Sequence, residues 1–144
     1  MAAVRTAEAS WQGDLFSGSG TIESVGSGSF GPLPVTWASR TEEPGGRTSP
    51  EELIAAAHAS CFSMALANVL AKAGNPPMQL STVARVTFVA GTGITRSELV
   101  VEGTVPGLDE AEFVRAAQDA KDNCPVSQAL TGNVELAVSA RLQS

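Results

Sequence analysis

The residues best suited to chemistry are two cysteines, Cys61 and Cys124, and one histidine, His58. In a reducing compartment, two cysteines far apart in a chain are more often catalytic or redox-active than structural. The reactive form of cysteine is the thiolate, which needs a cation or a helix N-terminus beside it. Cys124 precedes Pro125 and therefore starts a short helix, whereas Cys61 lies in the middle of a long one. The residues alone also allow a buried, inert Cys61 and a Cys124 that only caps a helix.

His58 lies three residues before Cys61 and therefore on the same side of a helix. Two interpretations follow: a Cys–His hydrolase, or a packed and hydrogen-bonded core histidine, which we favour. Two cysteines and one histidine at these separations match no zinc-binding spacing, so we expect no metal and no bound cofactor.

A long helix must position Cys61. Ser49 is a good N-cap, Pro50 suits the first helical position, Glu52 completes a capping box, and Gly74 ends the helix. The segment from Leu53 to Leu70 is apolar nearly all round, which is typical of a buried helix.

The rest of the sequence predicts three strands before this helix, at about 3–12, up to 25, and 33–39. After it come strands at 80–90 and 94–105, a helix at 110–122, a short helix to 130, and a strand at 134–142. Strands grouped in hairpins favour an α+β fold with an antiparallel sheet around the long buried central helix. The length predicts one domain over residues 1–144.

The net charge of −6 argues against a nucleic-acid partner, because nothing resembles a basic patch. Polar residues interrupt the long helix, so we expect no membrane span. The N-terminus lacks a hydrophobic signal core, which predicts a cytoplasmic protein.

Two motifs, SPEELIAAAHASCFSMAL around Cys61 and NCPVSQAL around Cys124, resemble the OsmC/Ohr family of osmotically inducible and organic hydroperoxide resistance proteins. The AAHAxCFSMAL core is more similar to the OsmC branch, and the WxGD turn at Trp11 fits as well. The resemblance covers essentially the whole chain. It implies a stress-defence peroxidase that reduces hydroperoxides, organic ones preferentially, and a fold of intertwined homodimers.

The resemblance also implies roles for four residues. Cys61 would be the peroxidatic cysteine, oxidised to a sulfenic acid, and Cys124 the resolving cysteine that forms a disulfide with it. Arg40 would stabilise the thiolate and the transition state, with Arg47 and Arg5 as alternatives. Glu51 would orient the arginine. An external dithiol of the lipoyl type, free or on a lipoylated protein, would reduce the disulfide.

Ten helical residues place Glu51 about 15 Å from Cys61 along one helix, too far to share a site. Two such helices crossing antiparallel near Ala56 would bring Glu51 of one chain opposite Cys61 of the other. We therefore expect a homodimer with composite active sites. We also expect a substrate pocket lined by Phe62 and Met64.

A second hypothesis is a non-enzymatic redox-responsive or ligand-binding stress protein, in which the disulfide is structural or sensory. A disulfide closing so long a loop could stabilise the fold by roughly 4 kcal/mol. Peroxide turnover with a dithiol distinguishes the two hypotheses, because a structural disulfide would not cycle.

Overall fold

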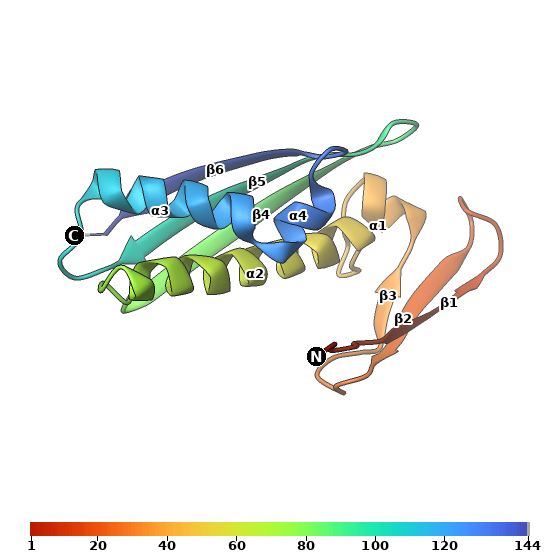
Figure 1. The fold of residues 1–144 in the computed structure, drawn as a ribbon. Helices are drawn as coiled ribbons and strands as arrows, with labels where there is room; N and C mark the ends of the chain where they lie inside the picture. Colours follow the sequence, from red (N-terminus) through yellow and green to blue (C-terminus); the bar gives the residue numbers. More distant parts are fainter. Residues whose placement is uncertain (144) are drawn as a thin grey trace. The chain divides into compact units, whose positions relative to one another are not determined.

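The long predicted helix forms in the computed structural model as α2 (Pro50–Lys72), and the structure describes residues 1–143 (Figure 1). The chain divides into two units, Met1–Leu53 and Ile54–Ser144, and each is described by itself. The single domain expected over 1–144 stays a prediction.

The first unit holds the antiparallel sheet β1-β2-β3, formed by β1 (Ala7–Gln12), β2 (Ser19–Val25) and β3 (Leu33–Val35). The Trp11 ring lies against the backbone of Gly20, where an added Cβ would come within 2.5 Å of a ring carbon. This close approach requires glycine at position 20.

The predicted third strand over 33–39 is wrong beyond Val35, because helix α1 (Trp37–Thr41) follows β3. A capping box starts α1. The Thr36 hydroxyl accepts the Ser39 N–H at 3.0 Å, and the Ser39 hydroxyl accepts the Thr36 N–H at 3.0 Å. This box satisfies two backbone donors and outweighs the strand preference of the β-branched and aromatic residues around it.

The second unit holds the sheet β4-β5-β6, formed by β4 (Gln79–Val89), β5 (Gly93–Thr104) and β6 (Glu135–Leu142). β4 and β5 pair antiparallel as predicted, whereas β5 and β6 pair parallel, so this sheet is mixed. The reason is the connection: α3 (Glu110–Asn123) and α4 (Pro125–Leu130) together carry the chain back across the sheet, as parallel pairing requires.

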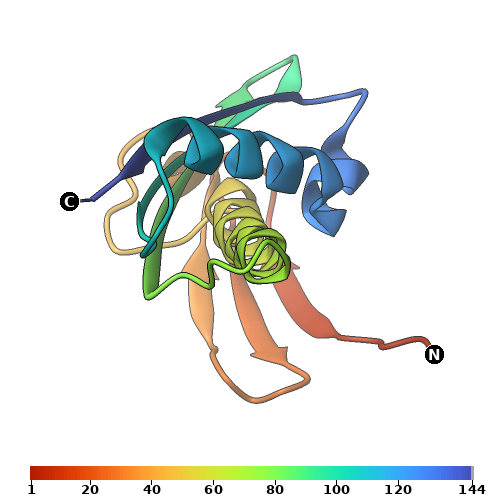
Figure 2. The same ribbon diagram turned by 60° about the vertical axis from the view of Figure 1, so that its left-hand side comes forward.

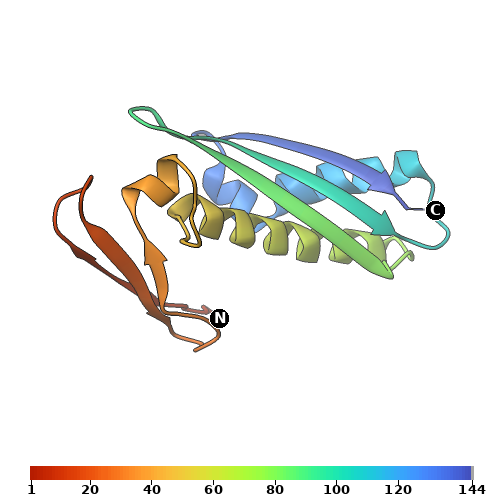
Figure 3. The same ribbon diagram turned by 180° about the vertical axis from the view of Figure 1, so that it is seen from behind.

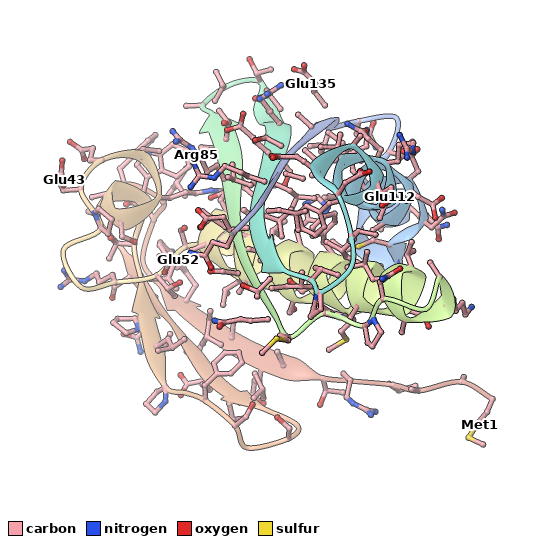
Figure 4. All side chains as sticks on the ribbon, turned by 90° about the vertical axis from the view of Figure 1, so that its left-hand side faces the viewer. Met1, Glu43, Glu52, Arg85, Glu112 and Glu135 are labelled. Carbon is pink, nitrogen blue, oxygen red and sulfur yellow. The ribbon has the colours of Figure 1, made fainter. Side chains whose placement is uncertain are left out.

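Helices α2 and α3 cover one face of this sheet, and Figure 2 shows them beside each other. Figure 3 shows the opposite face of the sheet, with α3 behind the strands. In Figure 4, Arg85 of β4 lies on the outer face and Glu112 on the helical side. The space between helices and sheet is filled by fully buried side chains: Phe62, Leu66, Leu70, Leu99, Val101, Phe113, Ala117, Ala120 and Cys124.

The helix α2 is buried on one face only, which differs from the expectation of burial all round. Its other face is exposed in the single chain, along Ala56, Ala57, Ser60, Met64 and Asn68. Met64 is 73% exposed and lies on this face. The sequence pattern therefore describes a helix that has more apolar surface than this chain alone covers.

By length and composition α2 could also cross a lipid bilayer, since its most apolar 18-residue window has a mean hydropathy of 1.7. The expectation that polar residues exclude such a span was therefore too strong. The core helix of a water-soluble domain meets the same criteria, and Phe62, Leu66 and Leu70 of α2 pack in the core. The packing of these residues indicates a core helix.

Candidate active site

The structure brings the two predicted cysteines together, and both are free thiols. Cys61 lies in the middle of α2 and is half-buried, whereas Cys124 is fully buried at the start of α4. The two thiols are neighbours, since both the Cys124 thiol and the backbone N–H of Val126 act on the Cys61 sulfur, and Cys61 packs against the core cluster that contains Cys124. Proximity of two thiols, one of them accessible, is what a disulfide between them requires.

Burial raises the pKa of the Cys61 thiol above its ordinary value of 9.0, and the neighbouring Cys124 raises it further. The Val126 N–H acts in the opposite direction, because a donor to the sulfur stabilises the thiolate. The net pKa shift is upward. These groups alone therefore leave Cys61 mostly protonated at neutral pH, and a reactive thiolate needs a further positive charge.

Cys124 joins two helices, because it is both the C-cap of α3 and the N-cap of α4. Its backbone N–H donates to Ala120 O at 2.9 Å, and Pro125 occupies the first helical position of α4. The Cys124 side chain makes no capping hydrogen bond, so its sulfur does not act as a weak cap. The helix start predicted at this cysteine is confirmed.

In the first unit, Arg40 and Glu51 form a bidentate ion pair. Arg40 Nε donates to Glu51 Oε1 at 3.0 Å, and Arg40 Nη2 donates to Oε2 at 2.8 Å. The Glu51 side chain is only 8% exposed and that of Arg40 27%. The guanidinium also lies 5.9 Å from the centroid of the Trp37 ring, a cation–π contact. The carboxylate and the ring together fix the plane of the guanidinium.

The two adjacent glutamates at the start of α2 have separate roles. The Ser49 hydroxyl accepts the Glu52 N–H at 3.2 Å, as the predicted N-cap should. The Glu52 carboxylate accepts a hydrogen bond from the Thr48 hydroxyl at 2.7 Å. Glu52 is exposed and its hydrogen bonds stabilise the start of the helix, whereas Glu51 forms the ion pair with Arg40.

The two alternative arginines lie elsewhere. Arg5 and Arg47 are both exposed, and Arg5 Nη1 donates to the neighbouring Val4 carbonyl at 2.9 Å. Of the three candidates, Arg40 is the arginine that Glu51 holds in the described chain.

A cleft of about 520 Å³ lies beside Arg40 in the first unit. Its walls are mainly apolar and include Trp11, Leu15, Val35, Trp37 and Pro50. The expected pocket around Phe62 and Met64 was wrong, because Phe62 is fully buried in the core. Sequence analysis missed Trp37 because it was assigned to a strand. The signal that could have found it is Thr36 and Ser39, spaced as a capping box.

His58 is fully buried, and both of its ring nitrogens meet serine hydroxyls. Nδ1 lies 2.6 Å from Ser97 Oγ and Nε2 lies 2.8 Å from Ser127 Oγ. Burial lowers its pKa below 6.5, so the ring is neutral at pH 7. Both nitrogens are occupied, which removes the base that a Cys61–His58 hydrolase would need. The packed-histidine interpretation is confirmed.

Among residues 1–143, no group of three or more His, Cys, Asp or Glu is arranged to hold a metal ion. Two neighbouring thiols can exchange between the dithiol and the disulfide form. This site on an α+β fold defines a thiol-dependent oxidoreductase.

Comparisons with known proteins agree with this class. The family model described as OsmC-like protein matches residues 43–139. The chain is 44% identical over 132 residues to peroxiredoxin OsmC of Escherichia coli, covering 90% of this chain and 91% of that protein. It is 33% identical over 101 residues to an organic hydroperoxide resistance protein of Xanthomonas axonopodis, covering 66% and 68%. A solved OsmC structure from Legionella pneumophila superposes with a TM-score of 0.70 at 26% identity, covering 97% and 99%.

The chain therefore belongs to the OsmC-like family. It is a cysteine peroxidase of the peroxiredoxin type, with a role in resistance to hydroperoxides. The hypothesis of a non-enzymatic stress protein is not supported.

Proposed function

We propose that Cys61 is the peroxidatic cysteine and Cys124 the resolving one. The observation that carries this proposal is the contact between the two free thiols where α4 begins. The Cys61 thiolate attacks one oxygen of a hydroperoxide ROOH, the O–O bond breaks, and the alkoxide takes up a proton to leave as ROH. Cys61 becomes a sulfenic acid. The Cys124 thiol then displaces the hydroxyl from the Cys61 sulfur, which forms the disulfide and releases water.

A dithiol completes the cycle. Cys61 is the more accessible of the two sulfurs, so an external thiolate attacks it and releases Cys124. The second thiol of a dithiol then displaces Cys61 from the mixed disulfide within the same molecule, whereas a monothiol must wait for a second encounter. This difference favours a dithiol of the lipoyl type, free or protein-bound.

The raised pKa of Cys61 requires a cation, and we propose Arg40. Glu51 and Trp37 hold the guanidinium in one plane, as is needed to stabilise a thiolate and the developing alkoxide. The apolar cleft beside Arg40 suits the alkyl or aryl part of an organic hydroperoxide, with the peroxide oxygens toward the guanidinium.

We further propose that the protein is a homodimer and that Arg40 and Glu51 serve Cys61 of the partner protomer. Ten helical residues separate Glu51 from Cys61, a rise of about 15 Å. The exposed face of α2 carries small residues at Ala56, Ala57 and Ser60, which allow two helices to approach closely.

The cytoplasmic location stays a prediction.

The two cysteine roles are tested by peroxide consumption with dihydrolipoamide as reductant. Cys61→Ser should abolish turnover, because no sulfur is left to attack the peroxide. Cys124→Ser should complete one turnover with dihydrolipoamide absent, and mass spectrometry should then find the Cys61 sulfenic acid as a dimedone adduct. Equal turnover by wild type and Cys61→Ser would overturn the proposal.

Wild type should also turn over faster with dihydrolipoamide than with a monothiol at equal thiol concentration.

A further inference from the structure

Three buried polar side chains in the second unit take no part in the proposed reaction. His58 of α2, Ser97 of β5 and Ser127 of α4 are each fully buried. The imidazole lies between the two hydroxyls, at 2.6 Å from Ser97 and 2.8 Å from Ser127. Burying polar groups is costly, so packing alone would favour apolar residues at these positions. These three side chains, the His58 cluster, therefore call for an explanation beyond core filling.

The His58 cluster links the two helices that carry the cysteines. His58 lies three residues before Cys61 on α2, and Ser127 lies three residues after Cys124 on α4. The hydrogen bond between His58 and Ser127 therefore joins α2 to α4 about one helical turn away from each cysteine. Ser97 holds the other ring nitrogen from the sheet and fixes the plane of the imidazole.

Helix α4 needs such a link. It has six residues and no side-chain hydrogen bond at its N-cap, so its position depends on tertiary contacts. Apolar packing is not directional and leaves a short helix free to shift along or rotate about its axis. A hydrogen bond is directional, and a histidine held at both nitrogens can fix a helix against rotation. A disulfide tolerates only a narrow geometry between its two cysteines.

We propose that His58 is a positioning residue for the resolving step. Through Ser127 it holds α4 so that the Cys124 sulfur reaches the Cys61 sulfenic acid, where a disulfide forms and water leaves. The inference rests on the proposed roles of the two cysteines. The attack of Cys61 on the peroxide does not use the Cys124 sulfur. The resolving step therefore depends on the His58–Ser127 hydrogen bond more strongly than the peroxide step does.

The test is a single turnover with one equivalent of cumene hydroperoxide. Samples are quenched with dimedone, and mass spectrometry measures the thiol, sulfenic-acid and disulfide forms. Ser127→Ala should slow disulfide formation roughly 10-fold or more, because small misplacements of reacting groups have large effects on rate. The dimedone adduct of Cys61 should accumulate, and the peroxide step should change less.

Ser63→Ala is the matched control. The Ser63 hydroxyl also lies on α2 and pairs with a hydroxyl of the sheet, Thr82 Oγ1, at 2.7 Å, but it does not involve α4. This variant should form the disulfide at the wild-type rate. Ser127→Thr keeps a hydroxyl and should recover most of the lost rate.

The proposal is overturned if Ser127→Ala forms the disulfide as fast as wild type, or if Ser63→Ala is slowed equally. Should Ser127→Ala fail to fold, His58→Gln serves in its place, because one amide cannot hold both serines, and a wild-type rate there would also refute the proposal. If the wild type itself forms no Cys61–Cys124 disulfide, the proposed function fails and this inference fails with it.

Discussion

Glu51 and Glu52 are adjacent and identical in type, yet only one of them faces the arginine. Glu51 is buried and holds Arg40 with two hydrogen bonds, while Glu52 is exposed and accepts from Thr48. The helix explains the difference, since successive residues point about 100° apart around its axis. At the residue scale, the carboxylate of Glu51 and the ring of Trp37 both contribute to the position of Arg40.

We expect Glu51→Gln to lower the second-order rate constant of Cys61 with cumene hydroperoxide roughly 10-fold, because charge-assisted hydrogen bonds are among the stronger ones. Stopped-flow oxidation of the reduced protein measures it. Glu52→Gln is the control and should stay near the wild-type rate. Similar rates for the two variants would show that Glu51 does not orient a catalytic arginine.

At the scale of elements, helix ends were the easiest features to predict and short irregular segments the hardest. The start of α2 and the start of α4 at Cys124 follow from Ser49, Pro50 and Pro125, whose local chemistry is nearly independent of the fold. Trp37 is different. Its strand preference is real, but the capping box at Thr36 starts α1 instead.

The buried His58 links α2 to α4 and predicts a dependence of stability on pH. The ordinary pKa of histidine, 6.5, applies in the unfolded chain, and burial lowers the pKa of His58 in the folded protein below it. Between the folded and the unfolded pKa, the unfolded chain therefore binds the proton more readily. Stability should therefore be unaffected by His58 above pH 6.5 and fall as the pH drops below it, by at most about 1.4 kcal/mol per pH unit.

Urea unfolding of wild type and His58→Gln between pH 5 and 7.5 measures this effect. His58 is the single histidine of the chain. Subtracting the free energy of unfolding of His58→Gln from that of wild type removes the pH dependence of the carboxylates, which both proteins contain. This difference in free energy should shrink as the pH falls. A difference that stays constant over this range would mean that the histidine keeps an ordinary pKa.

At the scale of the whole molecule, two facts favour a composite site in a dimer. The thiol of Cys61 is made less acidic by its own surroundings, and the apolar helix α2 has an uncovered face. A second copy of the chain would address both, because it would cover α2 and bring a guanidinium to the sulfur.

Mixed dimers test this arrangement. Arg40→Ala and Cys61→Ser proteins should each be nearly inactive alone. If Arg40 acts on the partner's thiol, mixing equal amounts and allowing subunits to exchange should restore about a quarter of wild-type activity, from one intact site in each heterodimer. If Arg40 acts within its own chain, the mixture stays inactive. A fully active monomer at micromolar concentration would also contradict the dimer.

The sequence by itself determined the long helix, the α+β class and the family, because these depend on helix termini, periodicity and two long motifs. Only the tertiary structure decided which residues meet. It selected Arg40, rather than Arg5 or Arg47, as the partner of Glu51, set the Trp37 ring beside the guanidinium, and placed His58 between Ser97 and Ser127. The parallel pairing of β5 with β6 was also decided at this level. Such contacts join residues far apart in the chain, and local sequence patterns carry no information on which distant partner a side chain will reach.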